Sequence, residues 1–137
     1  MNNLLNRLAK FIVVVLLLHP FSSAWSDDAD ANSKRGRVYF KMVCTVCHIQ
    51  SSGKAIPPNT RTMDEWRAYM DAGKHDASGT VNPSLRYYMS KGYRESIKDT
   101  NKAAGKFLDL SDEQVFADVR KFAVTGAKDS DTPASCE

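Results

Sequence analysis

Thiol and imidazole side chains are scarce in this chain, which has three cysteines and three histidines among its 137 residues. Cys44 and Cys47 stand close together, but a tetrahedral zinc site built on them needs two further ligands at compatible spacing. Once the first 26 residues are set aside, as argued below, Cys136 and His75 are the remaining candidates outside the segment 44–48. This scarcity of ligands argues against a structural zinc site.

Strand-like patterns are missing, because no stretch shows the period-two alternation of apolar and polar residues that is typical of β-strands. A redox-active dithiol usually opens a helix in a strand-rich, thioredoxin-like domain, so this absence argues against that function for Cys44 and Cys47. Apolar residues instead recur at helical spacing in four segments, and no segment repeats another. The sequence therefore predicts an all-α fold.

Long hydrophobic runs are absent as well. The unbroken apolar run Phe11–Leu18 is far shorter than the roughly 20 residues that a membrane-spanning helix needs. Arg7 and Lys10 precede this run and small residues follow it, as in a secretory signal peptide cleaved after Ala24 or Ser26. We therefore expect export to the periplasm and no stable membrane span in the mature protein.

A strong excess of charge of either sign is also missing. Removing the signal, residues 1–26, takes away two of the 19 basic side chains and none of the 16 acidic ones, which leaves a formal charge of +1. Positive and negative charges are therefore nearly equal in number, which gives no indication that the protein binds nucleic acid. Residues 27–137 suffice for one small domain, with a core over residues 33–126 and loose polar tails at 27–33 and 128–137.

The first two helical segments are predicted from apolar spacing and a start signal. The first runs from about Ser33 to the cysteines, with apolar pairs four residues apart at Val38 and Met42 and at Tyr39 and Val43. The second begins with a capping box formed by Thr62 and Glu65 and ends near Gly73. Its inner face is expected to carry Met63, Trp66 and Met70.

The last two helical segments are bracketed by caps and glycines. Asn82-Pro83 looks like an N-cap followed by proline at the first helical position, and Gly92 supplies a stop, with Leu85, Tyr88 and Met89 lining this helix. Ser111 and Gln114 repeat the capping box, and the helix that they start is expected to end at Gly126.

The segment Cys44-Thr45-Val46-Cys47-His48 has the spacing that attaches haem c. Two cysteines three residues apart can each add across one haem vinyl group, and the next residue then presents its imidazole to the iron. The sequence therefore predicts one covalently bound haem, with Cys44 and Cys47 as anchors and His48 as the proximal iron ligand.

With this motif and two positions before it, the chain resembles the class I cytochromes c. Gly36 and Phe40, eight and four residues before Cys44, match a glycine and an aromatic residue of the family's first helix. The resemblance implies a bundle of about four helices around the haem. It also implies that the C-terminal helix crosses the first helix closely at Gly36, with Val119 and Phe122 at the crossing, because glycine has no side chain to separate the backbones.

The resemblance further implies a carbonyl that orients the proximal histidine. In the family a proline shortly after the ligand accepts a hydrogen bond from the second imidazole nitrogen, and Pro57 and Pro58 follow His48 by nine and ten residues. An ordinary loop proline pair is the alternative. The aromatic side chains of Phe40, Trp66 and Phe122 are expected to shield the haem from water. Trp66 either also donates its indole hydrogen to a haem propionate or only packs.

The distal iron ligand stays open at this point. The family usually takes it from a methionine in the loop before the C-terminal helix, but residues 93–109 contain neither methionine nor histidine. Met89 is the leading candidate as the nearest upstream methionine. The alternatives are Met63, Met70, His75, a lysine such as Lys98 or Lys102, or no protein ligand.

The resemblance implies a periplasmic one-electron carrier that serves redox partner proteins and is not itself an enzyme. A haem-based gas-binding or sensor protein with an open distal site, or a haem subunit of a larger oxidoreductase, are the alternatives. Cys136 could link two chains through a disulfide or be an unimportant thiol. A basic cluster is either an ordinary solvated surface or a docking rim for an acidic partner; it comprises Lys91, Arg94, Lys98, Lys102 and Lys106.

Overall fold

The computed structural model describes residues 30–75 and 82–135, and these residues form helices and turns without a strand. The all-α prediction is confirmed for this part of the chain. A continuous helical rod joins α2 (Ser33–Tyr39), the π-helical segment η1 (Phe40–Thr45) and α3 (Val46–Ser52). The predicted first helix therefore exists, and it continues through the cysteine motif until Gly53 ends it with a left-handed backbone.

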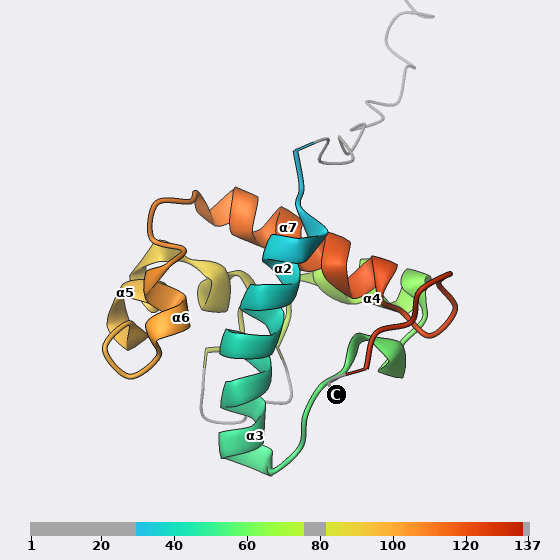
Figure 1. The fold of residues 1–137 in the computed structure, drawn as a ribbon, viewed down its shortest axis with the longest axis horizontal. Helices are drawn as coiled ribbons and strands as arrows, with labels where there is room; N and C mark the ends of the chain where they lie inside the picture. Colours follow the sequence, from blue (N-terminus) through green and yellow to red (C-terminus); the bar gives the residue numbers. More distant parts are fainter. Residues whose placement is uncertain (1–29, 76–81, 136–137) are drawn as a thin grey trace, which may run out of the picture.

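The C-terminal helix α7 (Asp112–Thr125) crosses α2 closely. In Figure 1 the rod runs down the molecule, α7 crosses behind it, α5 and α6 lie on one side and α4 lies on the other. A β-carbon added to Gly36 would lie 1.9 Å from the backbone oxygen of Asp118. The Phe40 and Phe122 rings also meet across the crossing, with centroids 5.5 Å apart. The predicted crossing of the first and last helices at Gly36 is confirmed.

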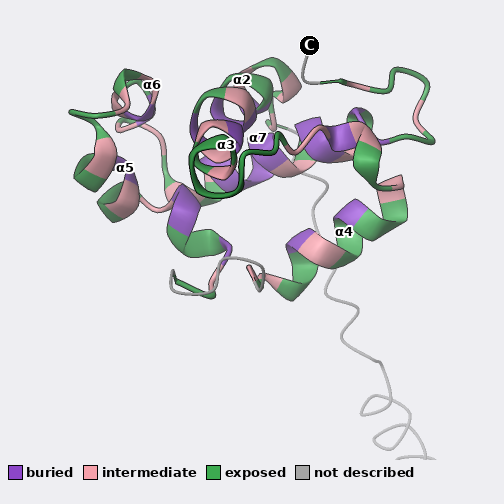
Figure 2. Cartoon of the chain, turned by 90° about the horizontal axis from the view of Figure 1, so that it is seen from below, coloured by how far each residue is buried: buried purple, intermediate pink, exposed green. Residues whose placement is uncertain are grey.

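One pair of apolar residues on the rod faces the core and the other does not. Tyr39 and Val43 are buried, whereas Val38 and Met42 are 45% and 49% exposed. Neighbouring residues point about 100° apart around a helix, so Val38 and Met42 lie on a different side of the rod from Tyr39 and Val43. The predicted helix is present, and Tyr39 and Val43 form the side of it that faces the core. Figure 2 shows buried residues along the inner sides of the rod and α7.

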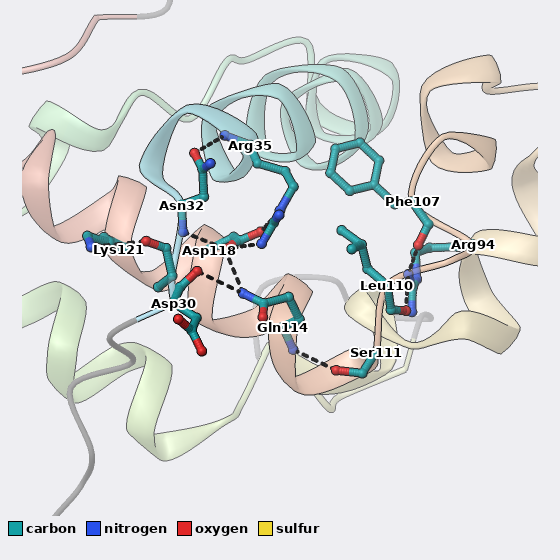
Figure 3. Close-up of polar contacts among 11 residues, drawn as sticks. Asp30, Asn32, Arg35, Arg94, Phe107, Leu110, Ser111, Gln114, Asp118 and Lys121 are labelled. Atoms are coloured by element: carbon teal, nitrogen blue, oxygen red, sulfur yellow. Dashed lines mark hydrogen bonds and ion pairs between the residues drawn. The ribbon is translucent and has the colours of Figure 1, made fainter.

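A buried carboxylate fixes the start of α2 on α7. Asp118, 1% exposed, accepts hydrogen bonds from the Asn32 backbone N–H at 2.6 Å and from the Arg35 guanidinium, as Figure 3 shows. This carboxylate raises the pKa of Arg35. Gln114 donates its side-chain amide to Asp118 at 3.1 Å, while Ser111 accepts the Gln114 backbone N–H. Of the two hydrogen bonds of the capping box predicted for α7, the one from the Gln114 backbone N–H to the Ser111 hydroxyl is formed, whereas the Gln114 side chain bonds Asp118 instead of the Ser111 backbone.

Helix α4 (Met63–Ala72) begins and ends where the sequence predicts. The Thr62 hydroxyl accepts from the Glu65 backbone N–H at 3.1 Å, and the Glu65 carboxylate accepts from the Thr62 backbone N–H at 2.7 Å. The second bond is the main reason that the pKa of Glu65 is lowered. Trp66 and Met70 are buried on the inner face of α4, and Met63 is partly buried beside them.

Removal of the cap oxygen is expected to weaken the protein measurably. Thr62→Ala should lower the free energy of unfolding by about 1 kcal/mol, because the Glu65 N–H loses its acceptor at the helix start. Thr62→Ser keeps the oxygen and should stay close to the parent protein. Urea unfolding followed by circular dichroism measures the difference, and equal stability of the alanine and serine variants would contradict the role of the hydroxyl.

The helix predicted between Asn82 and Gly92 does not form. Residues 83–85 run back along the end of α4 instead, where Leu85 N–H donates to the Gly73 carbonyl at 2.8 Å. The Asn82 side chain accepts from Ser84 N–H and makes a local turn. A short 3₁₀ turn η4 (Arg86–Met89) follows, and then α5 (Lys91–Ile97), which contains Gly92, and α6 (Lys102–Gly105).

The described parts of both predicted tails are attached to the core. At the C-terminal end Ala134 N–H donates to the Gly126 carbonyl at 2.9 Å, and Lys128 N–H donates to the Arg61 carbonyl at 2.9 Å. At the other end the Lys121 ammonium group donates to the Ala31 carbonyl at 3.0 Å. The prediction of loose tails was therefore wrong for residues 30–33, which side chains of α7 hold, and for residues 128–135, which pair with the core through backbone hydrogen bonds.

The predicted signal peptide and Cys136 lie outside the described residues. None of the helices over residues 30–75 and 82–135 combines the length and apolar character needed to span a membrane. Within the predicted basic cluster, Arg94 is fully buried and does not belong to the surface. The other members of the cluster are exposed; they are Lys91, Lys98, Lys102 and Lys106.

Candidate haem attachment site

The cysteine motif lies on the helical rod at the junction of η1 and α3. Cys44 belongs to η1, and Cys47 and His48 belong to the first turn of α3. Both cysteines are free thiols; Cys44 is half-buried against the core and Cys47 is exposed. Burial raises the pKa of Cys44 to about 12. The motif therefore presents one sulfur at the core and one at the surface from the same helix.

His48 directly follows Cys47 and is half-buried. Burial lowers its pKa, which favours the neutral imidazole, the form that binds metal ions. The backbone carbonyl of His48 accepts the Ser52 hydroxyl at 2.8 Å within α3. His48 is thus held on a regular helix with its ring in a partly dry setting, as a proximal iron ligand requires.

A second imidazole faces His48 from another part of the chain. The rings of His48 and His75 have centroids 5.5 Å apart and planes inclined at 64°. His75 follows the left-handed Gly73 that ends α4, and its backbone N–H donates to the Pro83 carbonyl at 2.7 Å. The return of residues 83–85 along the end of α4 therefore brings His75 to the motif.

One tyrosine packs on the second of these histidines and another packs on that tyrosine, and no sequence motif indicated either of them. The Tyr88 ring packs on His75 with centroids 4.7 Å apart and on Tyr93 at 5.2 Å. Tyr39 on the rod donates its hydroxyl to the Tyr88 backbone carbonyl at 2.6 Å, which fixes this segment. Burial, and then the proximity of Cys47 and Cys44, raises the pKa of Tyr93 to about 12. The three closely spaced tyrosines at positions 87, 88 and 93 were the sequence feature that could have indicated an aromatic surrounding for the site.

The carbonyls of Pro57 and Pro58, predicted to orient His48, bond other groups in this structure. The Pro57 carbonyl accepts the Thr60 hydroxyl at 2.8 Å, and the Pro58 carbonyl accepts the Trp66 indole N–H at 2.7 Å. The Trp66 indole is therefore engaged with the backbone, and a haem propionate would have to displace this bond. Packing is the role that this geometry gives Trp66.

The predicted aromatic wall forms a cluster within the core. The Phe40 ring meets Trp66 at 5.9 Å and Phe122 at 5.5 Å between centroids. Met89, the leading distal candidate, is 1% exposed and belongs to the same hydrophobic core, as does Met70. Of the predicted distal candidates, His75 has its side chain in contact with the His48 ring.

This donor set suits a covalently attached haem. Two free thiols and an imidazole come from one helix, and a second imidazole faces the first. Over residues 30–75 and 82–135, no three His, Cys, Asp or Glu side chains converge in a way that could hold a bare metal ion. No family model, no curated protein and no solved structure matches the chain.

Proposed function

We propose that this protein is a periplasmic monohaem c-type cytochrome that carries single electrons between redox partner proteins. The observation that carries the proposal is the cysteine motif on a continuous helix, with the His48 ring opposed by a second imidazole. The close crossing of α2 and α7 at Gly36 supports it, because the resemblance to class I cytochromes c implies that crossing.

The two cysteines would hold the haem through thioether bonds. Each thiol adds across one vinyl group, so that sulfur bonds one vinyl carbon and the thiol hydrogen goes to the other carbon. Bound haem would supply a one-electron ferric–ferrous couple. His48 would supply an iron ligand from the same helix, so the thioether bonds would also position the iron close to the His48 imidazole.

The surroundings of the motif favour electron transfer over chemistry on a substrate. Tyr88 packs on His75, and Tyr93 packs on Tyr88, so aromatic side chains cover part of this region. Cys47 is exposed, so the thioether edge of the haem would lie near the surface, where a partner can approach. Exposed lysines on α5 and α6 favour an acidic partner, for which complementary charge raises the association rate.

Coexpression with a bacterial haem-attachment system tests the proposal. We expect a red protein whose intact mass exceeds that of the bare mature chain by one haem, and whose pyridine haemochrome spectrum indicates two thioether bonds. A Cys44→Ala, Cys47→Ala double variant should lose all haem that resists acid–acetone extraction. Cys136→Ala is the matched control and should keep the haem. A colourless parent protein with the mass of the bare chain would overturn the proposal.

A further inference from the structure

The distal side of the site can be assigned from the path of the chain around His75. Gly73 ends α4 with a left-handed backbone, and His75 then pairs with Pro83 through its N–H. The isolated bridge between Lys74 and Ser84 belongs to the same pairing. His75 is therefore held where residues 73–75 pair with residues 83–85 through backbone hydrogen bonds.

The His75 ring is fixed by an aromatic neighbour as well as by its backbone. Tyr88 packs on one side of it at 4.7 Å between centroids, and the Tyr88 hydroxyl donates to the Asn82 carbonyl at 3.0 Å. The Tyr88 backbone carbonyl is in turn bonded by Tyr39 of the rod that carries His48. The two histidines are thus connected through a short series of buried contacts.

The separation of the two rings is close to that of two imidazoles bound to opposite sides of one metal ion. Two imidazoles bound to opposite sides of one metal ion, each through a bond of about 2 Å, have centroids roughly 6 Å apart. The observed separation is 5.5 Å.

The other predicted ligands are less well placed for this role. Met89 and Met70 are 1% and 2% exposed and pack within the hydrophobic core. Moving either sulfur to the iron would remove packed apolar surface from that core. Lys98, which directly follows α5, and Lys102, which begins α6, are exposed.

We propose that His75 is the second axial ligand, so that the haem iron is held between the imidazoles of His48 and His75. The inference rests on the proposed haem attachment and replaces Met89 as the distal ligand. Two nitrogen ligands give a six-coordinate, low-spin iron with a lower reduction potential than a histidine–methionine pair. Such a site transfers electrons and does not bind gases readily.

Spectra of the ferric and ferrous holoprotein test the assignment. The parent protein should be low-spin, should lack the near-infrared band of methionine-to-iron charge transfer, and should not bind carbon monoxide when reduced. His75→Ala should become high-spin and bind carbon monoxide, and added imidazole should restore the low-spin spectrum. His75→Met should raise the reduction potential in a potentiometric titration.

Met89→Leu is the control, because it removes the sulfur but keeps most of the buried volume. It should keep the low-spin spectrum and the reduction potential of the parent protein. A methionine charge-transfer band in the parent protein, or a low-spin His75→Ala variant that still carries covalent haem, would refute His75 as the ligand. Absence of covalent haem from the parent protein would instead overturn the proposed function and this inference with it.

Discussion

Gly36→Ala is expected to lower the free energy of unfolding by about 3 kcal/mol or more, at the upper end of the overpacking range. The added β-carbon would lie 1.9 Å from the Asp118 oxygen, 2.4 Å from the Asp118 carbonyl carbon and 3.0 Å from the Val119 nitrogen. These are backbone atoms, so no side-chain rotation relieves the clash. Helices α2 and α7 would have to separate.

Separation of the helices would also weaken the contacts that the crossing brings together. Asp118 would move away from the Asn32 N–H, and the Phe40 and Phe122 rings would lose their contact. At 4–8 °C per kcal/mol for a domain of about this size, the midpoint of thermal unfolding should fall by roughly 12 °C or more. Thermal unfolding of the holoprotein, followed by circular dichroism, measures it.

Gly92→Ala is the matched control for this experiment. Gly92 lies in α5, and a β-carbon there would meet no atom within 4 Å. The same substitution should therefore stabilise the protein by about 0.5–1 kcal/mol, because alanine favours the helix more than glycine does. If the Gly36 variant behaved like the Gly92 variant, the close crossing of α2 and α7 would be refuted.

Arg94→Met is expected to lower the free energy of unfolding by about 3 kcal/mol, through the loss of several buried hydrogen bonds. The Arg94 side chain is fully buried and donates to the backbone carbonyls of Ser90, Phe107 and Leu110 and to the Asp112 carboxylate, in part shown in Figure 3. Methionine fills much of the same volume but donates nothing. The carbonyls of Phe107 and Leu110 would lose these donors.

The control for Arg94 is a neighbouring charge that makes no buried contact of this kind. Lys91 lies on the same helix and its side chain is exposed, so Lys91→Met removes one positive charge and should change stability by less than about 0.5 kcal/mol. Urea unfolding of both variants separates the effect of net charge from that of the buried bonds. Similar stability of the two variants would show that Arg94 does not hold the loop before α7.

Local signals in the sequence predicted several elements well. Thr62 and Ser111 start helices at the expected residues, because capping involves atoms within three or four residues of each other. The same kind of signal failed at Asn82. There the competing interaction is the pairing of residues 83–85 with the end of α4, and this pairing is invisible to a cap pattern.

The candidate site was predicted on its proximal side and incompletely on its distal side. Cys44, Cys47 and His48 form a contiguous motif, so their geometry follows from one helix. His75 was one of several open candidates, because nothing in its own surroundings marks it as a ligand. Its relevance appears only when the return of residues 83–85 and the Tyr88 ring place it opposite His48.

By itself, the sequence determined the helical class, the cap positions of α4 and α7, the glycine at the helix crossing and the cysteine–histidine motif. Tertiary structure alone decided that Asp118 and Arg94 are buried anchors, that Met89 packs in the core and that His75 meets His48. The physical reason is the range of the interactions. Caps and motifs act within one or two helical turns, whereas His48 and His75 are 27 residues apart and are brought together only by the folded path between them.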